Sequence, residues 1–335
     1  MLRVFHLLDD FGMGGVTNGL RVFDDPVIAE LVNSMVLPID PRWRLAPHLP
    51  DADVIVTHFP PAWNNLPFFR TLRLRNPHAH LVHVEHTYTA AYERRRVPRK
   101  ARFRAMLRLA LSARAVDEIV CVSRAQARWL RQAAGLDTTR CRTIYPWSCK
   151  DELLKIDPVA PRRGQPLRLG CYGRLATVKN FGPLIEACKR FCPGEIELLV
   201  GGYGTQEDEL RVIAGDAANI RFHGEVKDLA GFMAQCDAIV MPSLWEAYGQ
   251  VATEARLAAR PILVADIDGL PEQVGGAGLC VRLDTADAIE AAIRRFRMMP
   301  LTQMALSGRA AARMIGNQVR FAWRDLFTRV SLSRA

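Results

Sequence analysis

Two glutamates stand eight residues apart in a segment that follows the apolar run AIVMPS, from Ala238 to Ser243. Glu246 lies in the turn that leaves this predicted strand, and Glu254 lies on the helix predicted to follow it. Gly249 permits a tight entry to that helix, and the backbone amides around Gly249 and Gln250 form an anion site that the helix dipole supports. One carboxylate near each end of such a site suits a nucleotide sugar. Glu254 would accept hydrogen bonds from ribose hydroxyls and Glu246 from hydroxyls of the transferred sugar; the alternative is two solvated glutamates.

Two cations follow another predicted strand directly. Arg174 and Lys179 lie on the loop after LRLGCYG, which runs from Leu167 to Gly173. Such a pair can neutralise the charge that accumulates on a departing nucleoside diphosphate without a metal. No D-x-D triplet or histidine cluster in the sequence offers a convincing divalent-ion site, so we expect metal-independent chemistry with no cofactor.

A glycine pair and a histidine follow strands in the first half of the chain. Gly14 and Gly15 come after the first predicted strand, where their backbone could approach a phosphate or a sugar; a simple strand-to-helix turn is the alternative. His86 ends the predicted strand LVHVEH, so it should project into the cleft, and it is the preferred functional candidate among the eight histidines. His58 and His83 are its competitors, and a core or surface role is the alternative for all three histidines.

The Glu246 and Glu254 pair, spaced E-x7-E, resembles the signature of the family 4 glycosyltransferases. These are retaining enzymes with the GT-B fold, in which two Rossmann-like domains face a central cleft. Several further motifs, in order along nearly the whole chain, are similar to those of the family: FGMGGV (residues 11–16), CVSRA (121–125), YGRLATVKN (172–180), VGGYG (200–204), FHGEV (222–226) and DGLPE (268–272).

The resemblance implies roles for particular residues. Arg174 and Lys179 become diphosphate ligands, and His86 lies beside the transferred sugar. Glu225 and Val226 lie where family members hold the nucleobase through main-chain groups. The implied catalytic set is Glu246, His86, Arg174 and Lys179. The implied donor-binding set is Gly14, Gly15, Arg174, Lys179, Glu225, Val226, Glu246, Tyr248, Gly249, Gln250 and Glu254.

Buried strands predicted between helix-length segments indicate how these residues are positioned. The runs are too apolar to be half-solvated, which favours parallel sheets covered on both faces. Because ligands bind at the carboxyl ends of strands in such α/β sheets, residues that follow strands are the informative ones. The predicted strands span residues 2–8, 53–59, 81–86, 118–123, 167–173, 196–202, 220–224, 238–243 and 261–266.

The length of 335 residues exceeds the size at which a single core stops growing, roughly 250 to 300 residues. A polar, proline-marked passage at residues 155–166 interrupts the strand pattern and is interpreted as a linker. We therefore predict an acceptor-side Rossmann-like domain over residues 1–158 and a nucleotide-sugar-binding one over 159–300. Residues 301–335 are predicted to be a helical segment that packs back on the first domain.

Composition narrows the classes of protein further. The chain is 49% hydrophobic and 24% charged, which excludes a disordered protein. It shows neither a signal-like segment nor an apolar stretch long enough to cross a bilayer, and its eight cysteines contain no C-x-x-C pair. We expect a cytoplasmic protein with reduced thiols. The net charge of +10 favours anionic partners.

Eight basic residues and no acidic one lie between Arg94 and Arg108, interleaved with apolar residues such as Phe103 and Leu107. Such a segment could rest a peripheral enzyme on anionic lipid at the inner membrane face. A solvated basic helix face is the alternative. Nucleic-acid binding is disfavoured, because the segment has one aromatic residue and no accompanying nucleic-acid module.

These observations predict a retaining glycosyltransferase of the hexosyl type. It would move a sugar from a nucleoside-diphosphate sugar to a glycan acceptor, lipid-linked, in surface polysaccharide or glycoconjugate biosynthesis. Two alternatives remain: a nucleotide-sugar epimerase of the same fold, and an inactive GT-B subunit that only binds donor or lipid.

Overall fold

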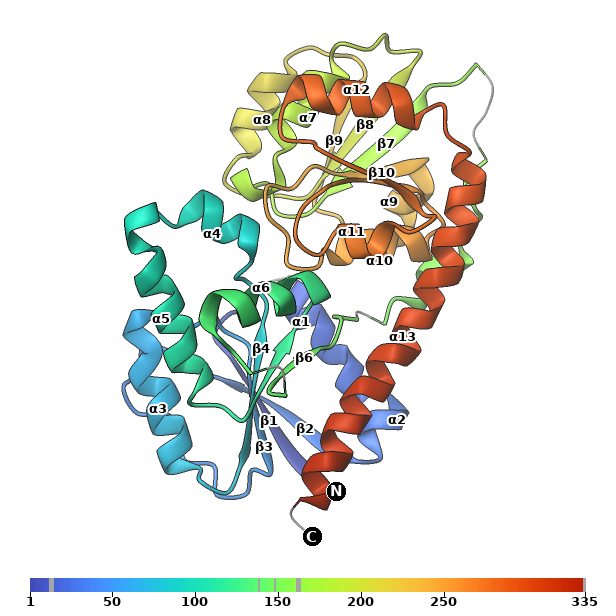
Figure 1. The fold of residues 1–335 in the computed structure, drawn as a ribbon. Helices are drawn as coiled ribbons and strands as arrows, with labels where there is room; N and C mark the ends of the chain where they lie inside the picture. The colour runs from blue at the N-terminus through green and yellow to red at the C-terminus, as the bar shows by residue number, and fades with distance from the viewer. Residues whose placement is uncertain (12–14, 138, 148, 161–163, 334–335) are drawn as a thin grey trace. The chain divides into compact units, whose positions relative to one another are not determined.

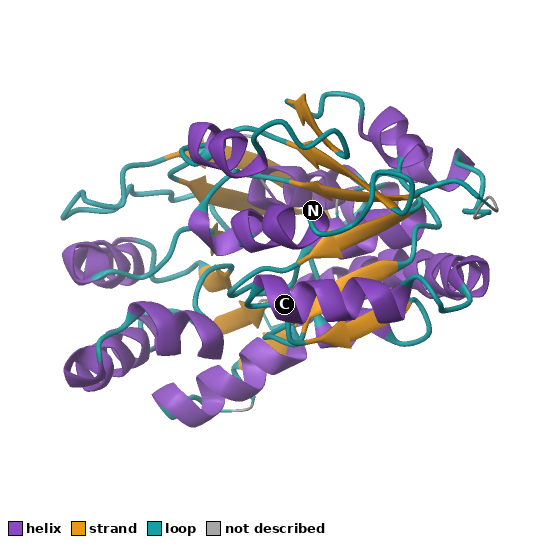
Figure 2. Ribbon diagram, turned by 90° about the horizontal axis from the view of Figure 1, so that it is seen from above, coloured by secondary structure: helices purple, strands orange, loops and turns teal. Residues whose placement is uncertain are grey.

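The computed structural model describes residues 1–11, 15–137, 139–147, 149–160 and 164–333 (Figure 1). The chain divides into two compact units. Unit 1 comprises Met1–Cys149 and Ile315–Ala335, and unit 2 comprises Lys150–Met314. Each unit is built around a parallel sheet of its own, with helices packed against it (Figure 2).

In the described part of unit 1, six strands form one sheet in the order β2-β1-β3-β4-β5-β6, and every neighbouring pair is parallel. The two inner strands at residues 54–57 and 118–121 are buried along their whole length and, apart from Glu118, consist of apolar and β-branched residues, as a sheet covered on both faces requires. The strands are β1 (Leu2–Leu8), β2 (Val32–Pro38), β3 (Val54–Thr57), β4 (His80–Glu85), β5 (Glu118–Cys121) and β6 (Cys141–Thr143).

Side chains that cap helix N-termini mark the start of several crossovers in unit 1. Ser123 accepts a hydrogen bond from the Gln126 amide, and Thr89 accepts one from the Tyr92 amide. The helices are α1 (Gly15–Gly19), η1 (Leu20–Asp24), α2 (Pro26–Ala29), η2 (Trp63–Asn65), α3 (Leu66–Arg75), α4 (Ala90–Arg96), η3 (Arg99–Ala101), α5 (Arg102–Ala113) and α6 (Arg124–Ala134).

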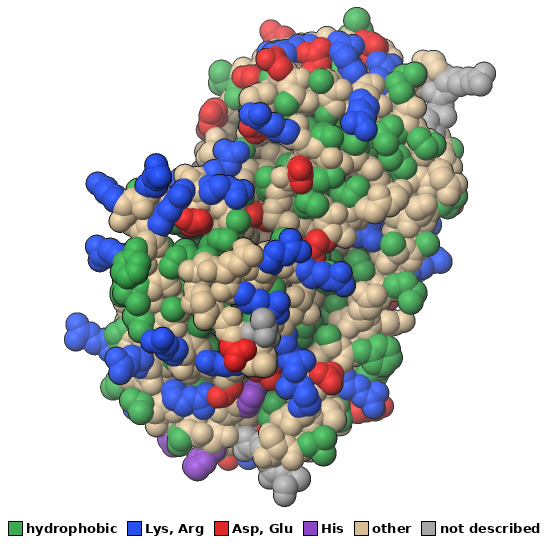
Figure 3. Space-filling view, viewed as in Figure 1, with side chains coloured by type: hydrophobic (Ala, Val, Ile, Leu, Met, Phe, Trp, Pro, Cys, Tyr) green, Lys and Arg blue, Asp and Glu red, His purple; other side chains and the backbone are tan. Residues whose placement is uncertain are grey.

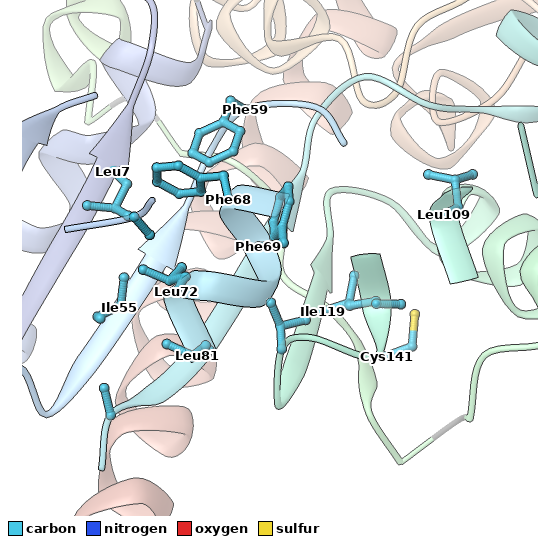
Figure 4. Packing of buried hydrophobic residues seen from close by; sticks show 14 of the residues in the cluster. Leu7, Ile55, Phe59, Phe68, Phe69, Leu72, Leu81, Leu109, Ile119 and Cys141 are labelled. Carbon is cyan, nitrogen blue, oxygen red and sulfur yellow. The ribbon is translucent and has the colours of Figure 1, made fainter. Parts of the chain in front are cut away.

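One face of the unit 1 sheet carries a core rich in phenylalanine (Figure 4). The rings of Phe59, Phe68 and Phe69 meet at centroid distances of 5.4 to 6.5 Å, and all three are buried. Leu7 of β1, Leu81 of β4 and neighbouring aliphatic side chains complete the cluster. This packing fixes the strand ends from which His58 and His86 follow.

In the described part of unit 2, six parallel strands lie in the order β12-β11-β10-β7-β8-β9. The strands are β7 (Leu167–Tyr172), β8 (Ile196–Gly201), β9 (Ile220–Gly224), β10 (Ala238–Met241), β11 (Ile262–Ala265) and β12 (Gly278–Val281). The helices are η4 (Asp151–Lys155), η5 (Thr177–Lys179), α7 (Phe181–Cys188), α8 (Glu207–Ala214), α9 (Leu229–Gln235), α10 (Gln250–Leu257), α11 (Pro271–Val274) and α12 (Ala286–Phe296).

The last helix, α13 (Leu301–Leu332), contributes to both units. Its first residues belong to unit 2, and residues from Ile315 onward belong to unit 1. The division after Cys149 precedes the expected boundary at 158, because the linker packs on unit 2. Leu153 is fully buried there, and Val159 packs with Ala259 and Ala305.

A charged cluster holds α13 against the unit 1 sheet. Glu118 of β5 is buried and accepts hydrogen bonds from Arg329 at 3.0 and 3.3 Å. Arg142 of β6 approaches the same carboxylate to 2.7 Å, and His80 of β4 lies 3.5 Å from it. Burial would raise the pKa of Glu118, but the hydrogen bonds from His80 and Arg329 and the charge of Arg142 outweigh it and lower the pKa to about 2.

We expect Glu118→Gln to destabilise unit 1 by on the order of 3 kcal/mol, because it removes the buried carboxylate that pairs with the half-buried Arg142 and Arg329. A carboxyl whose pKa is lowered on folding stabilises the fold above its unfolded pKa of 4.5, and this stability is lost as the pH falls toward about 2. Thermal unfolding across that pH range measures both effects. Glu207→Gln, in an exposed pair with Arg211, is the control and should change little; equal melting temperatures for both variants would contradict the prediction.

Candidate functional site

The two glutamates of the E-x7-E pair follow β10 at the carboxyl edge of the unit 2 sheet. Glu246 lies in the loop between β10 and α10, and Glu254 lies in α10 with its side chain buried. The loop begins directly after four buried strand residues, as the apolar run predicted. Glu246 is anchored through its backbone: its amide donates to Asp268 Oδ2 at 3.1 Å, and its carbonyl accepts from the Gly269 amide at 3.2 Å.

The structure brings Glu246 together with the predicted diphosphate ligand Lys179. Lys179 Nζ lies 2.6 Å from Glu246 Oε2, and each side chain keeps 19% of its surface exposed. Ser243 Oγ donates to the same oxygen at 3.3 Å. A backbone hydrogen bond of 2.8 Å from the Leu244 amide to the Val178 carbonyl holds the two loops together. The pair is therefore a preformed, partly accessible site with both signs of charge.

Glu254 is held by two residues that the sequence analysis did not single out. The Tyr172 hydroxyl, at the end of β7, donates to Glu254 Oε2, and Lys150 Nζ lies 3.5 Å from Oε1. Burial and the neighbouring carboxylate raise the pKa of Tyr172 well above its usual value, so the phenol stays protonated and can donate. Tyr172 stands inside the YGRLATVKN motif, whereas nothing in the spacing of Lys150 indicates its role.

Gly249 is required at the entry to α10. Its φ is +85°, and a Cβ there would lie 2.5 Å from Leu270 Cδ2 and 3.1 Å from Glu246 Cγ. The Gln273 side chain donates to the carbonyls of Tyr248 and Gly249 at 2.6 and 2.9 Å, which fixes this turn. Gln250 is the first residue of α10. The turn thus sets the direction in which the first amides of α10 point.

Tyr248 is placed differently from the other predicted donor ligands. Its ring is buried, and its hydroxyl lies 3.1 Å from Thr253 Oγ1 inside unit 2. Burial raises the pKa of Tyr248 to about 12. Its side chain packs within the unit, which leaves its backbone as the group that could reach a ligand.

Arg174 follows β7 and is exposed. It makes neither an ion pair nor a hydrogen bond with the residues that the structure describes. Its loop lies against the VGGYG loop, where Gly202 has a φ of +118° and a Cβ would lie 1.9 Å from the Gly173 carbonyl oxygen. Gly202 therefore permits the close approach of the two loops. The charge of Arg174 is therefore available to a ligand, whereas the charge of Lys179 is paired with Glu246.

The predicted base-site residues follow β9. Glu225 is exposed and lies 3.5 Å from Lys227 Nζ, and Val226 is half-buried. Val226 packs against Gly201, where an added Cβ would lie 2.6 Å from Val226 Cγ2. Both residues are at the carboxyl edge of the same sheet as Glu246 and Glu254.

The remaining predicted residues belong to unit 1. Gly14 lies outside the described residues, and Gly15 is the first residue of α1. His86 follows β4, is half-buried, and lines a small pocket of about 30 Å³ together with Phe23, Trp147 and Trp323. That volume has room for about two water molecules. Burial lowers the pKa of His86 to about 4, so the ring is neutral at pH 7.

The two competing histidines differ in their surroundings. His83 is buried, with Nδ1 2.9 Å from Thr57 Oγ1 and Nε2 3.5 Å from Glu85 Oε2, which agrees with a core role. His58 also lines the pocket, and its Nδ1 lies 3.2 Å from His86 Nε2.

Within the described ranges, no group of three or more His, Cys, Asp or Glu side chains is placed to hold a metal ion. The same residues contain no helix that is both long and apolar enough to span a membrane. Metal-independent chemistry remains a prediction.

Known structures share this fold over almost the whole chain. Sucrose-phosphate synthase from Thermosynechococcus elongatus superposes with a TM-score of 0.75 at 19% identity, covering 98% of this chain and 100% of that structure. HepE of Anabaena, in complex with UDP, superposes with a TM-score of 0.69 at 16% identity, covering 97% and 100%. The chain therefore has the GT-B fold of two Rossmann-like domains, as predicted.

Sequence comparisons identify the family. Residues 18–147 match the model described as Glycosyltransferase Family 4, and residues 166–297 match the model described as Glycosyl transferases group 1. This chain belongs to the family 4 glycosyltransferases, which confirms the resemblance.

Two curated relatives match part of the chain. The phosphatidyl-myo-inositol mannosyltransferase of Mycolicibacterium smegmatis is 32% identical over 183 residues, which are 52% of this chain and 46% of that protein. The O-antigen chain mannosyltransferase B of Escherichia coli is 30% identical over 166 residues, which are 47% of this chain and 42% of that protein. The matches thus span a little under half the length of these relatives.

Proposed function

We propose that this protein is a retaining glycosyltransferase that moves a hexose from a nucleoside-diphosphate sugar to a lipid-linked glycan acceptor. The observation that carries the proposal is the arrangement at the carboxyl edge of the unit 2 sheet: Lys179 lies against Glu246, Arg174 is exposed on the loop that leads from β7 to Lys179, and Glu254 is buried in α10. Cations there would stabilise the charge of the departing diphosphate. Glu254 would accept from the ribose, and Glu246 from the sugar.

The comparisons support the proposed donor and acceptor. HepE was crystallised in complex with UDP, so UDP-sugars are the first donors to test. The names of the two mannosyltransferase relatives refer to a phosphatidylinositol and to an O-antigen chain, which supports a lipid-linked acceptor. Retention would require the acceptor to attack the face from which the diphosphate leaves.

The direct test is to screen sugar nucleotides by thermal shift and then to measure release of the nucleoside diphosphate. A ligand at 100 times its dissociation constant adds about 2.7 kcal/mol of stability. The anomeric configuration of the product, read by NMR, tests retention. An inactive binding subunit would show the thermal shift without release, and an epimerase would return an isomerised sugar nucleotide.

We also propose that α4, η3 and α5 dock on anionic lipid. Figure 3 shows Lys and Arg side chains gathered over α4, with hydrophobic side chains beside them. Phe103 is 77% exposed, and Leu107 and Leu111 follow at intervals of four residues on the same face of α5, also exposed. Two cations of this segment already have partners within unit 1 and are less available to lipid headgroups. Arg102 pairs with Glu93 at 2.9 Å, and Arg108 covers the Tyr88 ring at 4.7 Å.

Binding to vesicles should therefore combine charge attraction with insertion of the exposed apolar side chains. We expect sedimentation with anionic but not neutral vesicles, weakened as the Debye length falls from about 10 Å at 0.1 M salt to about 3 Å at 1 M. Neutralising Arg94, Arg95, Arg96, Arg99 and Lys100 should abolish it, and Phe103→Ser with Leu107→Ser should weaken it at every salt concentration.

The control neutralises Arg190, Arg211 and Arg282, which are exposed on unit 2, and should leave vesicle binding intact. Donor binding should survive in all variants, because the proposed donor residues lie mostly in unit 2. Absence of vesicle binding by the unmodified protein would show that the basic run is a solvated face.

A further inference from the structure

Three histidines from three neighbouring strands of unit 1 form a hydrogen-bonded chain. His6 lies in β1, His58 directly follows β3, and His86 directly follows β4. His6 Nδ1 lies 3.0 Å from His58 Nε2, and His58 Nδ1 lies 3.2 Å from His86 Nε2. This chain of histidines starts in the interior at His6 and ends at the pocket that His86 lines.

All three rings are uncharged at neutral pH. His6 is 1% exposed and His58 is 8% exposed. Burial lowers the pKa of His6 to about 3, and burial together with the neighbouring histidines lowers the pKa of His58 well below its usual value. A neutral imidazole carries one N–H and one lone pair. Each ring in the chain therefore has one donor and one acceptor.

Two directions of donation satisfy both hydrogen bonds. In the first, His6 Nδ1–H donates to His58 and His58 Nδ1–H donates to His86 Nε2, which leaves the N–H of His86 on Nδ1. In the second, both bonds are reversed and the N–H of His6 lies on Nε2.

The surroundings of His6 distinguish these directions. His6 Nε2 is buried and has no hydrogen-bond partner among the described residues. The second direction would leave a buried N–H donor unpaired at that atom, whereas the first leaves only a lone pair there. Orphaned buried N–H groups are rare in proteins, so the first direction is favoured.

The charged and titratable groups nearest the chain do not interrupt it. The ring of His6 packs on Phe23 at 4.2 Å, which is apolar. His83 and Glu85 of β4 act on the chain electrostatically, but their facing atoms are 3.5 Å apart and pair with each other. Both nitrogens of His58, and Nε2 of His86, are occupied within the chain.

We infer that His6 and His58 are positioning residues that hold His86 as its Nδ1–H tautomer, so that His86 presents Nδ1–H as a hydrogen-bond donor to the bound sugar. The sugar as recipient rests on the proposed function. The tautomer of His86 itself rests only on the hydrogen bonds that join the three histidines. His86 can thus donate a hydrogen bond to a sugar oxygen without first gaining a proton.

The tautomer is measured directly by long-range ¹H–¹⁵N NMR on the full chain labelled with ¹⁵N-histidine, with His86 and His58 assigned from single variants. We expect Nδ1–H on both rings in the unmodified protein. His58→Phe should release His86 from the Nδ1–H form. His58→Asn should retain it, because the asparagine amide nitrogen takes the place of Nδ1. His83→Phe changes a buried histidine of β4 that is not part of the hydrogen-bonded chain and should leave the His86 tautomer unchanged.

An Nε2–H tautomer of His86 in the unmodified protein would overturn the inference, even if His58→Phe does not fold. So would an unaltered tautomer in folded His58→Phe. With an active donor, His58→Phe should lower kcat by about tenfold with little change in KM, and His58→Asn should restore most of it. If the unmodified protein turns over no sugar nucleotide, the proposed function fails, while the NMR result still decides on the histidine chain.

Discussion

Lys179→Ala and Arg174→Ala are each expected to lower kcat/KM by about 10²-fold or more while the protein remains folded. Both cations would stabilise charge that develops on the leaving diphosphate, and a single such group is worth several kcal/mol in a transition state. Lys179→Ala should be the more harmful, because it also removes the partner of Glu246 at 2.6 Å. Steady-state kinetics with the donor found in the screen measures the effect.

Arg190→Ala is the matched control, since Arg190 is an exposed cation of unit 2 that pairs with Asp287 and Glu290 of α12. It should leave kcat/KM unchanged. Full activity of both Lys179→Ala and Arg174→Ala would remove these residues from the proposed site.

Glu246→Gln and Glu254→Gln should separate turnover from nucleotide affinity. Glu254→Gln is expected to weaken binding of the bare nucleoside diphosphate by about tenfold or more, because it would remove the charge-assisted hydrogen bond that we propose between Glu254 and the ribose. Glu246→Gln should leave that affinity nearly unchanged and slow turnover by about 10²-fold, because Glu246 is proposed to contact the transferred sugar and not the nucleotide. Isothermal titration calorimetry and steady-state kinetics measure the two effects.

Tyr172→Phe provides an internal comparison, because it removes the hydroxyl that donates to Glu254 and leaves the carboxylate in place. It should resemble a mild Glu254→Gln in the calorimeter. Equal losses of affinity in Glu246→Gln and Glu254→Gln would contradict the division of roles.

The strands buried on both faces could be predicted from the sequence, and the missed strands lie at sheet edges. The runs that became β1, β3, β4 and β5 in unit 1 and β7, β8, β10 and β11 in unit 2 are mainly apolar. The strand β9 was also predicted, although it lies at a sheet edge and has no buried residue. In contrast, β2 alternates with exposed residues, β6 has three residues, and β12 is partly exposed. Each has a strand neighbour on one side only. An edge strand needs less apolar surface, so its hydrophobic pattern is weaker.

The positions of the site residues after strands were predictable, but their contacts were not. Glu246 and Lys179 were assigned to different parts of the donor, and only the packing of two loops shows that they pair. The histidine chain joins residues 52 and 28 positions apart, and no local pattern relates such positions. Spacing along the chain predicts which edge of a sheet a residue reaches. It does not predict which side chain it meets there.

The course of α13 has a consequence for synthesis on the ribosome. Unit 1 begins the chain, yet Trp323 and Phe327, which pack on Phe23, emerge only after all of unit 2 has been made. At about 5 to 20 residues per second, the interval after Cys149 lasts roughly 10 to 40 s. During this time the surface around Phe23 lacks the aromatic side chains that cover it in the finished protein. The unit translated first is therefore completed last, and its nascent form is the species that a ribosome-associated chaperone would meet.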